Sequence, residues 1–144
     1  MNSSAQTKGP ILAIDPGREK CGIAVVGLDA QVLHREIVPT KEIAAAASRL
    51  VEAYRAARLV VGDRTAAKDV CRALAAARIR LVPQMVDEHR SSEQARRRFF
   101  AENPPRGWRR LLPTTLLTPD RPYDDLVAVL LAERYLASKD EDRN

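Results

Sequence analysis

Acidic side chains stand at the ends of several apolar segments of this 144-residue sequence. Asp15 directly follows the apolar run of residues 11–14, and Glu88 follows another apolar run that ends at Val86. A carboxylate beside a buried strand is destabilising unless it has a partner. Further acids occupy comparable positions beside apolar segments: Asp63, Asp124 and Asp125. Carboxylates gathered in one pocket cannot all ionise without a counter-charge, and Mg²⁺ or Mn²⁺ would supply it.

Such a pocket has a specific chemistry, although each acid also has an ordinary structural explanation. Two divalent ions about 3.5–4 Å apart clamp the attacking and leaving oxygens of a phosphodiester displacement. Asp15 could instead be a turn residue before Pro-Gly, and Asp63 is favoured as a helix cap. The acids at 124 and 125 could stabilise a helix N-terminus through its dipole. Strand alternation turns one of the acids at 87 and 88 inward but does not say which.

Composition excludes several classes of protein. Apolar residues make up 45% and charged residues 30%, the balance of a globular chain rather than a disordered or fibrous one. No segment approaches the roughly 18 apolar residues of a membrane span, and the polar N-terminus lacks a signal-peptide core, so we expect a cytoplasmic protein. Cys21 and Cys71 form no metal motif and are expected to be reduced core or near-core residues. We expect a disordered lead over 1–9, one folded domain over 10–138 and a charged tail over 139–144.

Positive charge is concentrated in one segment. The formal net charge is +5, and between His89 and Arg110 the arginines outnumber the acids Glu93 and Glu102 by the same margin. These arginines are Arg90, Arg96, Arg97, Arg98, Arg106, Arg109 and Arg110. The planar fork of arginine suits phosphate, so the segment predicts a nucleic-acid surface, with a solvated helix face as the alternative. Trp108 lies among these arginines and is expected either to stack on an unpaired base or to anchor a loop on the core.

The apolar patterns predict five strands and four helices. Strands are expected over residues 11–14, 22–27, 31–38, 58–62 and 79–86, and Pro83 in the last one indicates an edge position or a bulge. Helices are expected over 41–57, 65–77, 91–101 and 123–137. Thr40, either Asp63 or Thr65, and either Ser91 or Ser92 are the predicted N-caps of the first three helices. Residues 102–122 hold five of the nine prolines, which indicates a functional or mobile loop.

This order of elements predicts an α/β fold. Short gaps join the first three strands into an antiparallel meander, and the later strand–helix units add two parallel strands to the same sheet. Right-handed crossovers place those two strands beyond the first one, so the first strand is central in a mixed five-stranded sheet flanked by helices. Asp15 then lies at the carboxyl end of the central strand, where open α/β sheets carry their sites.

Four segments resemble motifs of the RNase H-like nuclease superfamily, specifically the YqgF/RuvX family. They are Ile11-Leu-Ala-Ile-Asp15-Pro-Gly17 with Gly22-Ile-Ala-Val, Leu59-Val-Val-Gly62, Val86-Asp-Glu88 with the helix after it, and Tyr123-Asp-Asp125. The resemblance covers residues 10–137. Members of this family are described as Holliday-junction-resolvase-like proteins and as nucleases that mature precursor small-subunit rRNA. Asp-Pro-Gly in the first motif looks more like the resolvase branch of the superfamily.

The resemblance implies a site and a reaction. The metal-binding carboxylates of the family fall on Asp15, Glu88 and Asp124, with Asp125 as the alternative third ligand. These residues would be both catalytic and metal-binding, in a site for two Mg²⁺ or Mn²⁺ ions. The seven arginines and Trp108 would contact nucleic acid. Asp63 lies where the resolvase branch carries a strand-end acid, so it is an additional candidate ligand. The segment Gly62-Asp-Arg-Thr65 departs from the Pro-containing loop that the family usually carries there.

Three functions remain open at this point. The preferred one is a metal-dependent nuclease that acts on RNA, in rRNA precursor processing or RNA degradation. The first alternative is a Holliday junction resolvase, which requires a two-fold dimer to make symmetric cuts. The sequence shows no strong apolar dimer stripe, although the last helix could supply one, so a homodimer and a monomer both stay open. The second alternative is a non-catalytic RNA-binding module that uses the arginines alone.

Overall fold

The core of the molecule is a five-stranded mixed sheet. The structure is a computed structural model that describes residues 8–113, 117 and 119–143. The strands are β1 (Ile11–Asp15), β2 (Lys20–Val26), β3 (Val32–Pro39), β4 (Arg58–Gly62) and β5 (Pro83–Val86), in the order β3-β2-β1-β4-β5. β1, β2 and β3 pair antiparallel, whereas β4 is parallel to both β1 and β5. The predicted fold class and the central position of the first strand are therefore confirmed.

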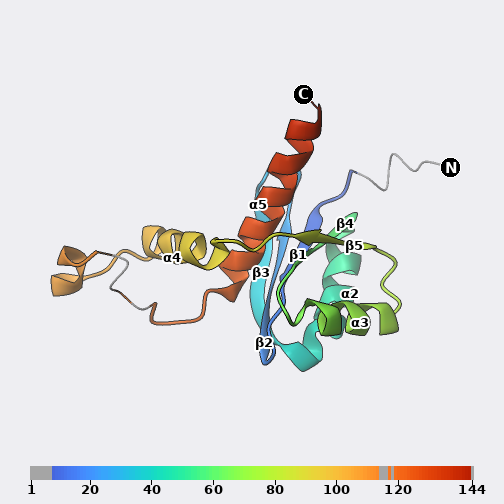
Figure 1. The fold of residues 1–144 in the computed structure, drawn as a ribbon, viewed down its shortest axis with the longest axis horizontal. Coiled ribbons are helices and arrows are strands. Elements are labelled where there is room, and N and C mark those ends of the chain that lie inside the picture. The colour runs from blue at the N-terminus through green and yellow to red at the C-terminus, as the bar shows by residue number, and fades with distance from the viewer. Residues whose placement is uncertain (1–7, 114–116, 118, 144) are drawn as a thin grey trace.

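Alternating side chains of the sheet build two apolar cores. On β1, Leu12 and Ile14 pack toward α2 (Ile43–Tyr54) and α3 (Ala67–Ala76) on one face. Ile11 and Ala13 pack toward α4 (Ser91–Glu102) and α5 (Asp124–Arg143) on the other. Figure 1 shows α5 crossing the sheet on the side opposite to α2. Because successive side chains of a strand alternate, Asp15 continues the row of Ile11 and Ala13 and faces the α5 side.

Two of the element boundaries that differ from the predictions have clear reasons. β5 begins at Pro83 rather than Ile79, because its partner β4 offers pairing positions only from Leu59 to Gly62. Pro83 stands at the start of an edge strand, as predicted. The last helix continues to Arg143 instead of ending near Ala137. Its charged final turns lack a proline or glycine that would end it.

The predicted helix caps are wrong. Thr40 opens a short 3-10 turn, η1 (Thr40–Glu42), and its hydroxyl donates to the carbonyl of Gly17 at 2.8 Å. Ser91 is the first residue of α4, and its hydroxyl donates back to the carbonyl of Glu88 at 2.7 Å. No side chain caps α3, where Ala66 stands at the N-cap position. In both cases the hydroxyl donates to a backbone carbonyl outside the helix instead of accepting a helix N–H, because such side-chain-to-backbone bonds compete with capping.

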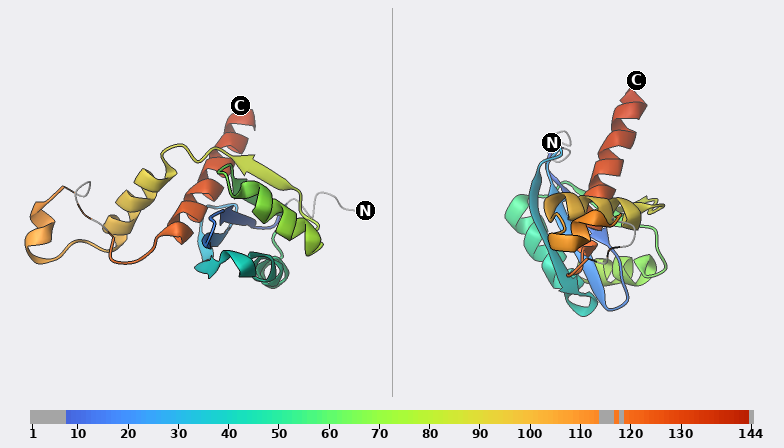
Figure 2. Two further views of the ribbon diagram at one scale, coloured as in Figure 1. Left: turned by 60° about the horizontal axis from the view of Figure 1, so that its bottom comes forward. Right: turned by 90° about the vertical axis from the view of Figure 1, so that its left-hand side faces the viewer.

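The proline-rich segment projects from the body of the molecule. After α4 the chain runs through a second 3-10 helix, η2 (Gly107–Leu111), which lies beyond the end of α4 and away from the sheet (Figure 2). We call residues 103–113 the arm. Phe99 and Phe100, at the end of α4, are buried against the core and anchor the base of the arm, as predicted for at least one of them.

Candidate nuclease site

Two glycines make room for acidic groups around Asp15. Gly22 lies opposite Asp15 on β2, and a Cβ there would stand 1.9 Å from the carbonyl oxygen of Asp124. On the other side, a Cβ on Gly62 would stand 2.4 Å from the carboxyl carbon of Glu88. The two strands that flank β1 thus omit a side chain on the face that Asp15 occupies. The missing side chains let α5 and the residue after β5 approach Asp15 closely.

Glu88 is held by the loop that follows β4. Its Oε2 accepts the backbone N–H of Arg64 at 3.0 Å, and the Arg64 Nε lies 3.4 Å from the same oxygen. The backbone N–H of Glu88 donates to Oδ1 of Asp63 at 3.2 Å. The predicted role of Asp63 as a cap of α3 is therefore wrong, because its carboxylate positions Glu88 instead. Of the acids at 87 and 88, Glu88 is the one that turns inward.

Asp15 and Glu88 form a buried acidic pair. Their exposed fractions are 4% and 5%, and Oδ1 of Asp15 and Oε1 of Glu88 have no hydrogen-bond partner within the described part of the chain. Burial, the side-chain contact with Glu88 and the charges of Glu88 and Asp124 raise the pKa of Asp15 from 3.8 to about 9, against the opposing charge of Arg64. Asp15 therefore carries a proton at neutral pH when no metal is bound. Unpartnered buried carboxylate oxygens of this kind fit a hard divalent cation.

Asp124, the predicted third ligand, pairs with Lys20 and not with the acidic pair. Asp124 influences Asp15 electrostatically, while its Oδ2 lies 3.6 Å from the Lys20 ammonium. Asp125 turns toward β3, where its Oδ2 lies 3.5 Å from Nε of Arg35. Within residues 8–113, 117 and 119–143, no group of three or more His, Cys, Asp or Glu side chains stands ready to hold a metal ion. The structure thus contains a preformed pair with Asp124 beside it.

The predicted arginines fall into different environments. Arg98 is paired within the protein, with Glu133 of α5 at 2.5 Å and Glu102 at 3.7 Å. Arg96 is half-buried, and its Nε has no hydrogen-bond partner in the described structure. Arg90 lines a cavity of about 630 Å³ between β5, α4 and α5. The exposed members of the set are Arg90, Arg97, Arg106 and Arg110, and Arg109 is half-buried.

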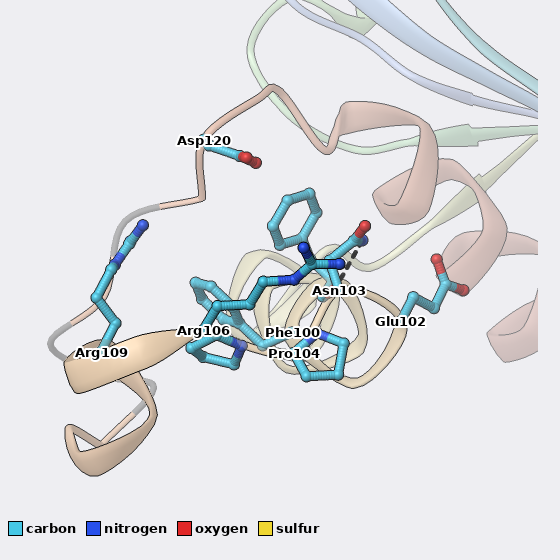
Figure 3. A pocket seen from close by; sticks show the side chains of 9 residues that line it. Phe100, Glu102, Asn103, Pro104, Arg106, Arg109 and Asp120 are labelled. Atoms are coloured by element: carbon cyan, nitrogen blue, oxygen red, sulfur yellow. Dashed lines mark hydrogen bonds between the residues drawn. The ribbon is translucent and has the colours of Figure 1, made fainter.

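The arm carries the remaining predicted contacts. Trp108 is 71% exposed, so its predicted alternative role as a core anchor is wrong. Leu111 on the same 3-10 helix is 80% exposed. Where the arm leaves α4, a cavity of about 670 Å³ is lined by Phe100, Asn103, Arg106 and Arg109, with Asp120 at its rim (Figure 3). This cavity is separate from the acidic pair, because neither Asp15 nor Glu88 lines it.

Two solved structures of Thermus thermophilus RuvC are similar to this chain in fold. A Thermus thermophilus RuvC in complex with a Holliday junction substrate superposes with a TM-score of 0.61 at 16% identity, over 91% of this chain and 95% of that one. A second Thermus thermophilus RuvC structure gives 0.62 at 13% identity, over 92% and 96%. The chain has a RuvC-like RNase H fold. The resemblance to the RNase H-like superfamily is thereby confirmed at the level of the fold.

Comparison of the sequence alone adds no closer relative. No protein-family model matches the chain, and no curated protein matches it. Among the described residues, no helix is long and apolar enough to cross a membrane.

Sequence reasoning missed three residues that shape the site. Gly22 and Gly62 were read as strand residues, yet each admits an acidic neighbour to Asp15. Arg64 was noted only as part of an unusual loop, although it contacts Glu88 directly. A glycine on each strand beside the acid-bearing strand is a signal that could have revealed the first two.

Proposed function

We propose that this chain is a cytoplasmic, divalent-metal-dependent nuclease that hydrolyses phosphodiester bonds in RNA. The observation that carries this proposal is the buried pair of Asp15 and Glu88 near the carboxyl end of the central strand, whose Oδ1 and Oε1 have no hydrogen-bond partner among the described residues. Burying two carboxylates side by side is costly without a cation. Such a pair near the carboxyl end of the central strand of a RuvC-like fold supports a nuclease rather than a module that only binds nucleic acid.

The roles of the acidic residues follow from their positions. Asp15 and Glu88 would hold Mg²⁺ or Mn²⁺ through their unpartnered oxygens, and Asp124 would complete the site after leaving Lys20. Asp125 is the weaker candidate for the third ligand because it already pairs with Arg35 on β3. Asp63 contributes by fixing the backbone of Glu88. Bound metal would supply an activated water and stabilise the leaving oxygen, in a one- or two-ion site.

Exposed arginines and the indole ring of Trp108, on α4 and on the arm that follows it, would bind the substrate. Arg97 on α4 and Arg106 and Arg110 on the arm extend into solvent, where guanidinium groups bind phosphates at little desolvation cost. Trp108 offers a stacking surface for an unpaired base. Arg96 is half-buried, and Arg98 serves mainly to join α4 to α5, so we assign the larger share of binding to the other arginines.

Four-way DNA is the second candidate substrate. It is favoured by the likeness to RuvC in complex with a Holliday junction, which extends over 91% of this chain. RNA is favoured by the resemblance of the sequence motifs to the YqgF/RuvX family. Symmetric cleavage of a junction requires two active sites related by a two-fold axis, and hence a dimer. The oligomeric state in solution therefore helps to separate the two candidates.

One cleavage panel tests the proposed function. Labelled single-stranded RNA, a structured rRNA precursor, single-stranded DNA and a four-way DNA junction are incubated with Mg²⁺ or Mn²⁺. We expect RNA cleavage that depends on metal and is lost in Asp15→Asn. Asp69→Asn is the matched control, because Asp69 is an exposed acid paired with Arg72 on the opposite face of the sheet.

The outcomes separate the candidates. Paired symmetric cuts in the junction alone would replace RNA by four-way DNA as the substrate. Binding without cleavage of any substrate, equal in the wild type and in Asp15→Asn, would contradict the nuclease and leave a nucleic-acid-binding module.

A further inference from the structure

The side chain of Arg64 lies against the acidic pair from the solvent side. Its Nε is 3.4 Å from Oε2 of Glu88, and its Nη2 donates to the hydroxyl of Ser92 at 2.7 Å. The guanidinium therefore bridges the carboxylate to the first turn of α4. About half of this side chain remains exposed, at 48%. Arg64 can consequently leave the carboxylate without breaking the packing of the core.

Arg64 is also the cation that balances the pair in the described structure. Lys20 is paired with Asp124 on the other side of β1, and of the neighbours that shift the pKa of Asp15 only Arg64 lowers it. A buried carboxylate such as Glu88 needs a hydrogen-bonded counter-charge to stay in position. The backbone N–H of Arg64 holds the same oxygen at 3.0 Å, so Glu88 remains oriented even if the guanidinium moves.

We propose that Arg64 is an exchangeable counter-cation: it neutralises Glu88 in the metal-free protein, releases it when a divalent cation binds, and then contacts a substrate phosphate. A guanidinium and a metal ion compete for one carboxylate, because their charges repel at such short range. The released guanidinium stays close to the site, because Arg64 lies in a short loop and Ser92 is within hydrogen-bonding distance of its side chain. Metal loading would thus create a phosphate contact next to the reacting bond.

This inference rests on the proposed metal site and makes Arg64 a substrate-binding residue that becomes available when the site holds metal. Its removal has opposite effects on two ligands, which a merely structural role would not produce. Without the competing guanidinium, Arg64→Gln should bind metal more tightly. Without the released guanidinium, the same variant should bind nucleic acid more weakly once metal is present.

Metal binding is the first measurement. Mn²⁺ and Mg²⁺ are titrated into the full-length wild type, Arg64→Gln and Arg72→Gln, and binding is followed by calorimetry and by the rise in the unfolding temperature. We expect Arg64→Gln to bind metal about two- to fivefold more tightly, the range for loss of one partly exposed ion-pair competitor. Arg72→Gln removes an equally charged but exposed residue from α3 and should match the wild type.

Two outcomes overturn the inference in different ways. If the wild type binds metal and Arg64→Gln binds it equally or less tightly, the inference fails and the metal site stands. If the wild type binds no metal, the inference and the proposed nuclease fail together. Should Arg64→Gln fold poorly, Ser92→Ala serves as the second variant, since it removes only the hydroxyl that holds Nη2. It should shift metal affinity in the same direction by a smaller factor.

Nucleic-acid binding is the second measurement. Anisotropy of a labelled single-stranded RNA is recorded with EDTA and with Ca²⁺, a divalent cation that also takes oxygen ligands. We expect Arg64→Gln to match the wild type in EDTA and to bind more weakly in Ca²⁺, with a salt dependence reduced by about one phosphate contact. An equal loss under both conditions would show that Arg64 contacts phosphate without exchange, and would overturn the proposal.

Discussion

The acidic pair carries its charged groups in the interior, whereas the arm carries groups of the opposite charge on an exposed segment. Asp15, the last residue of β1, and Glu88, just after β5, are 4% and 5% exposed. Trp108 and Leu111 are 71% and 80% exposed on a five-residue 3-10 helix outside the body of the molecule. Cleavage of a phosphodiester bond needs catalytic groups positioned to within a fraction of an ångström, and the ends of hydrogen-bonded strands hold side chains that precisely. Binding a flexible polymer needs reach and exposed charge, which a projecting segment provides.

The same contrast appears in the glycines of the two regions. Gly62 is surrounded, and any side chain there would meet Glu88, whereas a Cβ on Gly107 of the arm would meet nothing within 4 Å. Position 107 favours glycine because of its backbone conformation, with a φ of +64°. One region is therefore constrained by packing and the other only by local conformation. Substitutions around the acidic pair should therefore impair cleavage, whereas substitutions in the arm should impair RNA binding.

The largest expected effect comes from Gly62→Ala compared with Gly107→Ala. The new Cβ at 62 would stand 2.4 Å from the carboxyl carbon of Glu88 and push that side chain away from Asp15. We expect cleavage to fall at least about a hundredfold, since a displacement of about 1 Å has that cost, while the protein still folds. Gly107→Ala should retain full cleavage at saturating substrate. Equal cleavage rates in the two variants would contradict the division between the regions.

The next effect is the loss of the arm's charge. Changing Arg106, Arg109 and Arg110 together to alanine should weaken RNA binding about ten- to hundredfold and lower the salt dependence by about two ions. Cleavage at saturating substrate should change little, because none of these residues lies at the acidic pair. The control replaces three exposed cations of the opposite face, Lys68, Arg72 and Arg78. Matching losses in both triple variants would indicate a general charge effect and no role for the arm.

A smaller effect is expected from the exposed indole. Trp108→Ala should weaken binding of single-stranded RNA by about 1–3 kcal/mol, the value of one stacked base, and should leave the unfolding temperature unchanged. Leu111→Ala is the matched control, because Leu111 is at least as exposed but has no π face. Anisotropy titrations measure both variants. If duplex and single-stranded RNA lose affinity equally, Trp108 does not stack on unpaired bases.

A separate effect, on folding rather than on the substrate, is the pH dependence of stability without metal. The folded protein keeps the Asp15 proton up to about pH 9, whereas the unfolded chain releases it near 3.8. The folded state therefore binds more protons over this range, and the free energy of unfolding should fall as the pH rises from about 4 to about 9. Asp15→Asn should remove this slope and be the more stable protein near pH 8. Urea unfolding in EDTA at several pH values tests this, and parallel curves for the two proteins would contradict it.

Patterns local in the chain were sufficient for the sheet. The apolar runs, the short gaps between the first three strands and Pro83 at an edge led to the observed strand order. The inward position of Glu88 was left open, because alternation is ambiguous at the end of a strand. The caps failed because Thr40, Asp63 and Ser91 found partners distant in sequence or outside the helix. Hydroxyl and carboxylate groups choose among acceptors and donors that only the fold brings near.

Taken alone, the amino-acid order determined the α/β architecture, the acid at the end of the central strand and the clustering of arginine, since all three depend on periodicity and composition. Tertiary structure decided which acids meet. Gly22 and Gly62 admit Asp124 and Glu88 to Asp15 only because β2 and β4 flank β1 in register. It also decided that Arg64 would lie on Glu88 and that Trp108 would face solvent. Contacts between distant segments depend on strand pairing and helix packing, and no local pattern encodes them.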